Sequence, residues 1–175
     1  MSSEKGYLIV FTGNGKGKTT AALGMAMRAA GHGMKTLVLQ FIKGSWVYGE
    51  LQSFEKVDEI EIKPLGSGFT WKKGNLDEDR RLAEAGWEQA LAEIKRGYYD
   101  IIVLDELNLV LSYGLLQSKA VLESLQSRPP GPHIIVTGRN APDELIKAAD
   151  LVTEMKEIKH PFPDKGLKAR KGVEF

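Results

Sequence analysis

Residues 7–20 read Tyr7-Leu8-Ile9-Val10-Phe11-Thr12-Gly13-Asn14-Gly15-Lys16-Gly17-Lys18-Thr19-Thr20, and this stretch decides the fold. An apolar segment with strand character runs into a glycine-rich loop, and a segment rich in alanine and leucine follows. Strand, glycine-rich loop and helix, in this order, are the context in which a P-loop binds phosphate. Glycines let the main chain curl so that several N–H groups point at one anion, and the helix N-terminus adds the positive end of its dipole. The stretch therefore predicts a site for the phosphates of a nucleotide.

The P-loop motif predicts roles for individual side chains, although this loop differs from the usual motif at one position. Lys18 is expected to reach the terminal phosphates, and either Thr19 or Thr20 to offer a hydroxyl to Mg²⁺. The usual motif has a glycine at the position of Thr12, whereas this chain has its glycine one residue later, at Gly13. The alternative is a glycine-rich turn that merely precedes a helix. The coincidence of strand, glycines, lysine, threonine and helix favours the phosphate site.

A second apolar run supplies carboxylates. Residues 101–106 read Ile-Ile-Val-Leu-Asp-Glu, so a buried strand ends in Asp105 and Glu106. Carboxylate oxygens suit a hard cation such as Mg²⁺, and either residue could bind it directly or through water. The alternative is that both residues cap the next helix. Arg139 follows another apolar run, and we expect it at the same edge of the sheet, where it would neutralise phosphate charge unless it is an ordinary surface arginine.

The rest of the chain alternates between strand-like and helix-like segments. The expected strands are Tyr7–Thr12, Thr36–Ile42, Tyr99–Asp105 and His133–Thr137, with weaker ones at Ile60–Lys63 and Leu151–Met155. The expected helices are Lys18–Ala30, Leu76–Arg96, Ser118–Ser127 and Ala141–Ala149. This alternation predicts an α/β fold in which helices cover both faces of a mostly parallel sheet. Lys43–Trp71 and the tail from Lys159 lack clear periodicity, which is typical of functional or disordered segments.

Composition narrows the class of protein. A length of 175 residues suits one domain spanning 1–175, and a net charge of +1 gives no argument for a nucleic-acid partner. The sequence has no cysteine, which excludes disulfides and thiolate chemistry, and its three histidines show no metal-ligand spacing. No apolar run reaches transmembrane length and no signal peptide is apparent, so we expect a cytoplasmic protein without a membrane partner.

Several separated segments resemble the P-loop class of corrinoid adenosyltransferases. These segments follow one another in order over nearly the whole chain: Val10–Ala22, Gln40–Gly44 with Gly49-Glu50, Gly68–Trp71, Val103–Leu107, Thr137–Arg139 and Lys159–Gly166. The displaced glycine at Gly13 is itself a trait of that class, so the departure from the usual motif becomes support. A P-loop alone says little about the reaction, but this set of segments is specific.

The resemblance implies a fold, a reaction and partners. The fold would be the three-layer, RecA-like P-loop fold around a mostly parallel sheet of about six strands. The reaction would move the 5′-deoxyadenosyl group of ATP to the Co(I) centre of a reduced corrinoid, either cobalamin or a precursor, and release triphosphate. Mg²⁺ would be the cofactor, and a reductase or flavodoxin-like protein would supply the electron. Relatives are commonly homodimers.

The resemblance also implies a set of site residues. The catalytic candidates are Lys18, Asp105 and Glu106, and the Mg²⁺ ligands would come from Thr19, Asp105 and Glu106. The residues expected to bind ATP are Gly13, Asn14, Gly15, Lys16, Gly17, Lys18, Thr19, Thr20, Arg28 and Arg139. Phe69 and Trp71 are expected to contact the corrinoid, where bulky aromatic side chains would keep water and the nucleotide base off cobalt so that it accepts an electron more readily. His160 and Phe162 lie in a tail that could cover the site, and neither receives a chemical step.

Two other functions remain open at this point. A P-loop ATPase or kinase would use the same loop for phosphoryl transfer, with Glu106 positioning a water or a hydroxyl group. A regulatory module would sense ATP or a corrinoid without turnover, although the set of carboxylates for Mg²⁺ argues weakly against it. The reaction products, or the absence of turnover, would distinguish these functions from adenosyl transfer.

Overall fold

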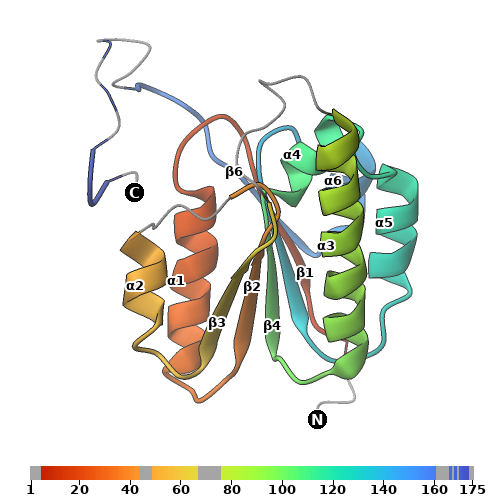
Figure 1. Ribbon diagram of the computed structural model, residues 1–175, viewed down its shortest axis with the longest axis horizontal. Coiled ribbons are helices and arrows are strands. Elements are labelled where there is room, and N and C mark those ends of the chain that lie inside the picture. Colours follow the sequence, from red (N-terminus) through yellow and green to blue (C-terminus); the bar gives the residue numbers. More distant parts are fainter. Residues whose placement is uncertain are drawn as a thin grey trace.

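The fold is an all-parallel sheet, seen here in a computed structural model that describes residues 5–43, 49–66, 76–160, 166, 168 and 170–173. The strands are β1 (Leu8–Thr12), β2 (Thr36–Gln40), β3 (Ile60–Pro64), β4 (Ile101–Asp105), β5 (His133–Thr137) and β6 (Leu151–Glu154). They lie in the order β3-β2-β4-β5-β1-β6, and every pair of neighbours is parallel (Figure 1). Over the described part of the chain, no helix has the length and apolar character needed to cross a membrane.

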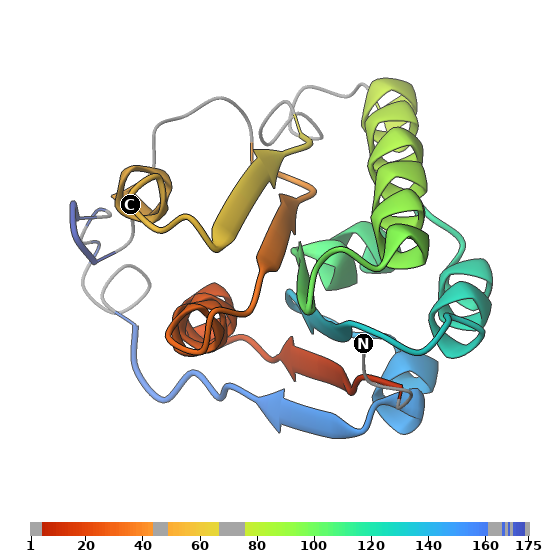
Figure 2. The same cartoon turned by 90° about the horizontal axis from the view of Figure 1, so that it is seen from below.

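Helices pack on both faces of the sheet and make three layers (Figure 2). They are α1 (Lys18–Ala30), α2 (Gly49–Phe54), α3 (Leu76–Arg96), α4 (Leu107–Ser112), α5 (Ser118–Gln126) and α6 (Asp143–Ala148). Buried side chains of α1 and α2 form one hydrophobic core with the sheet, and those of α3 to α6 form the other. This is the predicted three-layer arrangement.

The pleat of each strand explains how one sheet serves two cores. Successive side chains of a strand point to opposite faces. In β1, Leu8 and Val10 pack into the core beneath α3 to α6, whereas Ile9 and Phe11 pack into the core beneath α1. Strands β1, β2 and β4 are buried at every position, which is why their sequences are continuous rather than alternating apolar runs.

The structure confirms the predicted fold class and most of its elements. The helices predicted at Lys18–Ala30 and Leu76–Arg96 have these bounds, while several other predicted ends differ by one or two residues, the usual uncertainty of helix and strand ends. Helices α2 and α4 were not predicted. Each has six residues, too few for a 3.6-residue period to show in the sequence.

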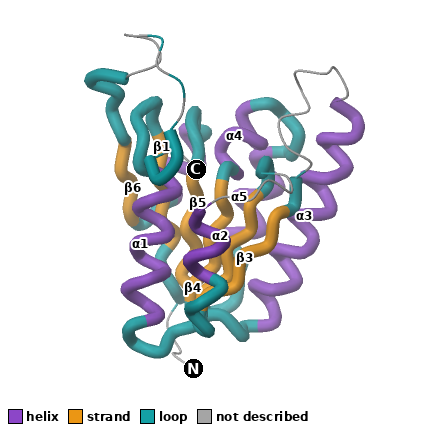
Figure 3. Tube along the Cα trace, turned by 60° about the vertical axis from the view of Figure 1, so that its left-hand side comes forward, coloured by secondary structure: helices purple, strands orange, loops and turns teal. Residues whose placement is uncertain are grey.

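Parallel strands bring their carboxyl ends to one edge of the sheet, and the loops after them gather there (Figure 3). The P-loop follows β1, Arg139 follows β5, Asp105 ends β4, and Lys43 follows β2. In open α/β sheets this edge is where ligands bind. Because β1 and β2 are separated by β5 and β4, the site draws on connections that are not neighbours in sequence.

Candidate functional site

The glycine-rich loop between β1 and α1 has the conformation that its sequence predicts. Gly13 and Gly17 have φ values of 93° and 108°, which side-chain-bearing residues rarely adopt. Thr12 is still part of β1, pairs with Glu154 of β6, and accepts the N–H of Ala141 at its hydroxyl oxygen over 3.2 Å. The turn therefore begins one residue later than in the usual motif, which explains why the glycine stands at position 13.

Lys18 opens α1 and folds back over the loop. Its Nζ donates to the carbonyl oxygens of Gly13 at 2.7 Å and Gly15 at 2.6 Å, and the residue is only 8% exposed. Burial lowers the pKa of Lys18, and the negative charge of Glu106 opposes that shift. An ammonium group has three N–H donors, so one remains to meet a phosphate after these two bonds.

Gly15 makes a contact that its sequence does not reveal. Its N–H donates to the carbonyl oxygen of Met155, just after β6, over 2.6 Å. A Cβ at position 15 would lie 2.7 Å from that oxygen and 2.8 Å from the carbonyl oxygen of Lys156. In this conformation the N–H of Gly15 is therefore engaged within the protein, contrary to the expectation that it faces phosphate. Gly15 instead allows the segment after β6 to lie against the loop.

Asp105, at the end of β4, joins three strands and the P-loop helix. The residue is fully buried, and its Oδ1 accepts the hydroxyl groups of Thr19 and Thr137, each at 2.7 Å. Its Oδ2 accepts Nε2 of Gln40 at 3.3 Å and lies 3.8 Å from Nζ of Lys43. Asp105 and Thr19, both predicted as candidate Mg²⁺ ligands, thus lie in contact with each other, and Gln40, Thr137 and Lys43 lie around the same carboxylate.

Glu106 has an unusual backbone and an unusual charge environment. Its φ of 64° is in the left-handed region, which costs a residue with a side chain of order 1–3 kcal/mol and is typical of functional positions. Burial raises the pKa of Glu106, the nearby charge of Asp105 raises it further, and three cations oppose this: Lys18, Lys43 and Arg139. Glu106 precedes α4 but makes no side-chain hydrogen bond to cap it, so the capping interpretation is not supported.

The structure gathers most of the other predicted residues around this loop. Arg139 is exposed after β5, and its charge acts on both Lys18 and Glu106. Asn14, Lys16 and Thr20 are exposed at the P-loop itself.

Among the described residues, Arg28 is not brought to this edge. Arg28 lies in the last turn of α1, about 15 Å from Lys18 along the helix axis and toward the opposite end of the sheet. Phe69 and Trp71 lie outside the described residues. His160 is partly buried, and Phe162 is also outside the described part of the chain.

The oxygen atoms at this edge fit a small hard cation. Mg²⁺ binds through one or two carboxylates together with phosphate and water oxygens, rather than through a dedicated protein cage. The adjacent hydroxyl of Thr19 and carboxylate of Asp105 provide such a partial set. Among the described residues, no cluster of three or more His, Cys, Asp or Glu side chains is suited to a metal ion.

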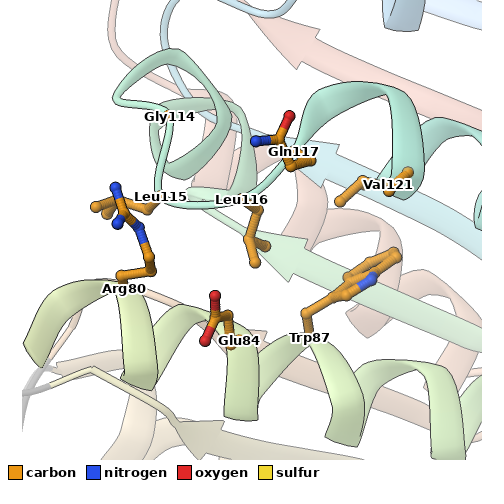
Figure 4. Close-up of a pocket in the computed structure, with 9 residues that line it drawn as sticks. Arg80, Glu84, Trp87, Gly114, Leu115, Leu116, Gln117 and Val121 are labelled. Atoms are coloured by element: carbon orange, nitrogen blue, oxygen red, sulfur yellow. The ribbon is translucent and has the colours of Figure 1, made fainter. Parts of the chain in front are cut away.

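A separate cavity lies on the flank of the molecule, between α3, α5 and the connection before α5 (Figure 4). Its volume is about 440 Å³, with Trp87, Leu116 and Val121 among its apolar residues and Arg80 and Glu84 along α3. None of the predicted site residues that the structure describes lines it.

Comparisons with known proteins identify the family of this chain. A family model for ATP:corrinoid adenosyltransferases of the BtuR/CobO/CobP type matches residues 4–175. The chain belongs to this family of ATP:corrinoid adenosyltransferases. It is therefore an enzyme of the transferase class, and the predicted resemblance is confirmed.

Individual relatives agree with the family assignment. The chain is 46% identical over 173 residues to a corrinoid adenosyltransferase of Pseudomonas aeruginosa, which covers 98% of this chain and 85% of that protein. It is 41% identical over 172 residues to a corrinoid adenosyltransferase of Escherichia coli, which covers 98% of this chain and 87% of the relative.

A solved structure agrees on the fold alone. The flagellar accessory protein FlaH of Methanocaldococcus jannaschii superposes with a TM-score of 0.53 at 11% identity, covering 86% of this chain and 71% of that one.

For this member of the family, sequence reasoning missed Gln40, Lys43 and Thr137 as site residues. A signal for two of them was present, because Gln40 and Thr137 are polar side chains at the carboxyl ends of buried strands. Lys43 lies in the segment Gln40–Gly44 that resembles the family, but no residue pattern placed it beside Asp105. Its position became visible only once β2 was placed beside β4.

Proposed function

We propose that this chain transfers the 5′-deoxyadenosyl group of ATP to the Co(I) centre of a reduced corrinoid, cobalamin or a precursor, and releases triphosphate. A single domain spanning residues 1–175 would carry the whole reaction. The observation that carries the proposal is the convergence of Lys18, Thr19 and Asp105 at a P-loop in a member of this family.

The reaction is a displacement at carbon. The Co(I) of the corrinoid substrate attacks C5′ of the ribose, its electron pair forms the cobalt–carbon bond, and cobalt becomes formally Co(III). The C5′–oxygen bond breaks, and triphosphate leaves with the electrons of that bond. The nucleophile comes from the substrate, so the protein needs none of its own.

The protein's task is to stabilise the leaving group. Negative charge grows on the triphosphate as the C5′–oxygen bond breaks, and donors placed where that charge develops lower the barrier. Lys18 is held at the centre of the loop by the carbonyls of Gly13 and Gly15, so it need not reorganise to meet the phosphates. Gly17 at the start of α1 adds a main-chain N–H, and Arg139 adds a second positive charge.

Mg²⁺, when bound with ATP, would screen the charge of the triphosphate, and Thr19 and Asp105, with Glu106 beside them, are the residues that would hold it. The oxygen atoms of Thr19 and Asp105 lie together, because Asp105 accepts the hydroxyl of Thr19.

The second substrate and the partners extend the proposal. Phe69 and Trp71 would contact the lower face of the corrinoid and exclude water from cobalt. A reductase or flavodoxin-like protein would deliver the electron that makes Co(I), and the enzyme would act as a homodimer. Family membership supports these points, and cross-linking with such a donor and a measured molar mass would test the last two.

Product analysis tests the central reaction. The protein is incubated with MgATP and a chemically reduced corrinoid, the absorbance of the cobalt–carbon bond is followed, and the phosphate products are separated. Adenosylated corrinoid and intact triphosphate in equal amounts are expected. ADP and phosphate would point to phosphoryl transfer, and binding without turnover under strongly reducing conditions would point to a sensor.

A further inference from the structure

Lys43 is a second lysine at the carboxyl edge, and the mechanism above leaves it unused. Its Nζ lies 2.6 Å from Oε1 of Glu50 and 3.8 Å from Oδ2 of Asp105. The side chain of Lys43 is only 18% exposed and that of Glu50 only 20% exposed. Lys43 is therefore mostly shielded from solvent and lies beside the fully buried Asp105, unlike a lysine on a solvated surface.

The backbone just before Lys43 is held in place by burial and by hydrogen bonds, and this positions Lys43 at the carboxyl edge of the sheet. Phe41 and Ile42 are buried in the core just before it. The N–H of Phe41 donates to the carbonyl oxygen of Asp105 over 3.1 Å, and the carbonyl oxygen of Gln40 accepts the N–H of Leu65 over 2.9 Å. The first bond holds the end of β2 beside the end of β4, and the second joins the end of β2 to the residue that follows β3.

Asp105 places Lys43 close to the P-loop. One oxygen of that carboxylate accepts the hydroxyl of Thr19, next to Lys18 in the first turn of α1, and the other faces Lys43. The ammonium of Lys43 and the hydroxyl of Thr19 therefore lie beside the same carboxylate group. A polyphosphate on the P-loop that extends past Thr19 toward β2 meets Lys43 next.

A cation at the position of Lys43 would offset negative charge at the carboxyl edge of the sheet. Asp105, Glu106 and Glu50 are negative, and triphosphate brings several more negative charges. The positive charges of Lys18 in the P-loop helix, Arg139 after β5 and Lys43 after β2 all act on Glu106. These cations thus come from different connections at the carboxyl edge of the sheet.

We propose that Lys43 binds the triphosphate, moving its ammonium group from Glu50 to phosphate oxygens as the leaving group separates. This inference rests on the proposed function, because it assumes that triphosphate leaves as a unit from this site. Glu50 retains Lys43 when no phosphate is present, and its partial exposure lets water solvate the carboxylate once Lys43 has moved. Lys43 would then contribute most in the transition state, where the leaving group carries the most charge.

Binding of inorganic tripolyphosphate in the presence of Mg²⁺ tests the proposal directly, by calorimetry on the intact chain. We expect Lys43→Met to weaken binding by about ten-fold or more, since it removes a charge-assisted contact, and Lys43→Arg to restore most of it. Glu50→Gln should bind tripolyphosphate as tightly as the wild type or more tightly, because Lys43 loses its competing partner. Lys56→Met, in the exposed turn after α2, is the matched control for loss of one positive charge and should change the affinity little.

Several results would overturn the proposal. One such result is that Lys43→Met binds tripolyphosphate as tightly as the wild type. Another is that Lys43→Met lowers the affinity by no more than the control Lys56→Met does. Glu50→Gln could weaken binding as much as Lys43→Met, which would show that the ion pair is only structural. Thermal melting identifies a variant that fails to fold, and Glu50→Gln and Lys43→Arg, which keep a positive charge at position 43, then decide the question.

Steady-state kinetics add a readout that a structural role would not produce. Removing a contact that forms only as triphosphate leaves lowers kcat and kcat/KM for ATP by the same factor, so KM for ATP should stay constant in Lys43→Met. If the wild type makes adenosylated corrinoid and binds tripolyphosphate, and Lys43→Met does both equally well, only the role of Lys43 is wrong. If the wild type neither makes adenosylated corrinoid nor binds tripolyphosphate, the proposed function is wrong as well.

Discussion

The hydroxyl of Thr19 donates to Oδ1 of Asp105 across 2.7 Å, although the two residues lie 86 positions apart. The same oxygen accepts the hydroxyl of Thr137, so two threonines from different elements hold one carboxylate. Thr19 stands in the first turn of α1 beside the phosphate loop, whereas Thr137 ends β5. Both hydroxyl groups donate to Asp105. Thr19 also lies at the phosphate loop, whereas Thr137 also accepts the N–H of Glu106 over 3.0 Å.

The shared bond to Asp105 gives a pair of variants to compare. Thr19→Val should cost about 1 kcal/mol of stability, since it removes one hydrogen bond to Asp105. Thr137→Val should cost about twice as much, because Thr137 also accepts the N–H of Glu106. Only Thr19→Val should also lower the affinity for MgATP and reduce turnover, by about 100-fold. Chemical denaturation and steady-state kinetics measure the two effects. Equal losses of turnover in both variants would show that Thr19 acts only by positioning Asp105.

Gly15 tests the contact between the P-loop and the segment after β6. In Gly15→Ala the new Cβ would meet the main chain of Met155 and Lys156 at 2.7–2.8 Å, and main-chain atoms cannot turn away as a flexible side chain can. We expect the segment to be displaced, a loss of about 1–3 kcal/mol, and turnover reduced by at least ten-fold. Denaturation and activity assays measure both losses, and wild-type values for both would contradict the packing.

Gly24 provides the matched glycine control. It lies in the middle of α1, and nothing comes within 4 Å of a Cβ built on it. Gly24→Ala should therefore stabilise the protein by about 0.5–1 kcal/mol, the usual gain of alanine over glycine inside a helix. Turnover should stay at the wild-type level, and the midpoint of denaturation in urea measures the gain.

Glu106 should make stability depend on pH. Burial and the charge of Asp105 raise the pKa of Glu106 in the folded protein. A carboxyl group with a raised pKa binds its proton more tightly in the fold than in the unfolded chain, so its ionised form costs stability. This cost is absent below the ordinary pKa of about 4.3 and appears as the pH rises through the raised value.

Glu106→Gln removes that cost. In the absence of Mg²⁺ and nucleotide, the variant should melt at a higher temperature than the wild type at pH 7, by about 2–4 °C for each kcal/mol relieved, and the difference should vanish toward pH 4. Turnover should fall, a trade of activity for stability that is common at active sites. Glu88→Gln, on the exposed face of α3, should show no such pH dependence. A variant that melts below the wild type at pH 7 would contradict the argument.

Lys18 should matter far more to the reaction than to folding. Lys18→Ala gives up two hydrogen bonds to loop carbonyls, but it also removes a buried amine whose pKa is lowered by that burial. These opposing effects should leave the melting temperature within a few degrees of the wild type, while turnover falls by at least about 100-fold. Thermal melting and activity are compared on the same preparation. Losses of similar size in both would mean that the lysine is mainly structural.

Trp71 tests the predicted corrinoid contact. If its ring excludes ligands from cobalt, Trp71→Ala should reduce turnover that starts from Co(II) more than turnover that starts from chemically prepared Co(I). The ratio of the two rates is the measurement. An equal loss from both starting states would remove the proposed role in reduction.

The sequence predicted the local parts of the site because their signals are local. A glycine-rich turn needs glycine where φ is positive, as at Gly13 and Gly17, and a strand buried on both faces needs a continuous apolar run, as in β4. Short helices such as α2 and α4 escaped because six residues do not show a period. Arg28 shows the limit of motif reasoning, since it lies in the same helix as Lys18 but at its far end.

By itself, the sequence determined the phosphate loop, the buried strands and the carboxylates at the end of β4. Only the tertiary structure decided which side chains meet there: Thr137, Gln40 and Lys43 at Asp105, and Met155 at Gly15. The physical reason is that the strand order β3-β2-β4-β5-β1-β6 sets these contacts. That order follows from how all the helices and strands bury their apolar faces together, and no local pattern of residues encodes it.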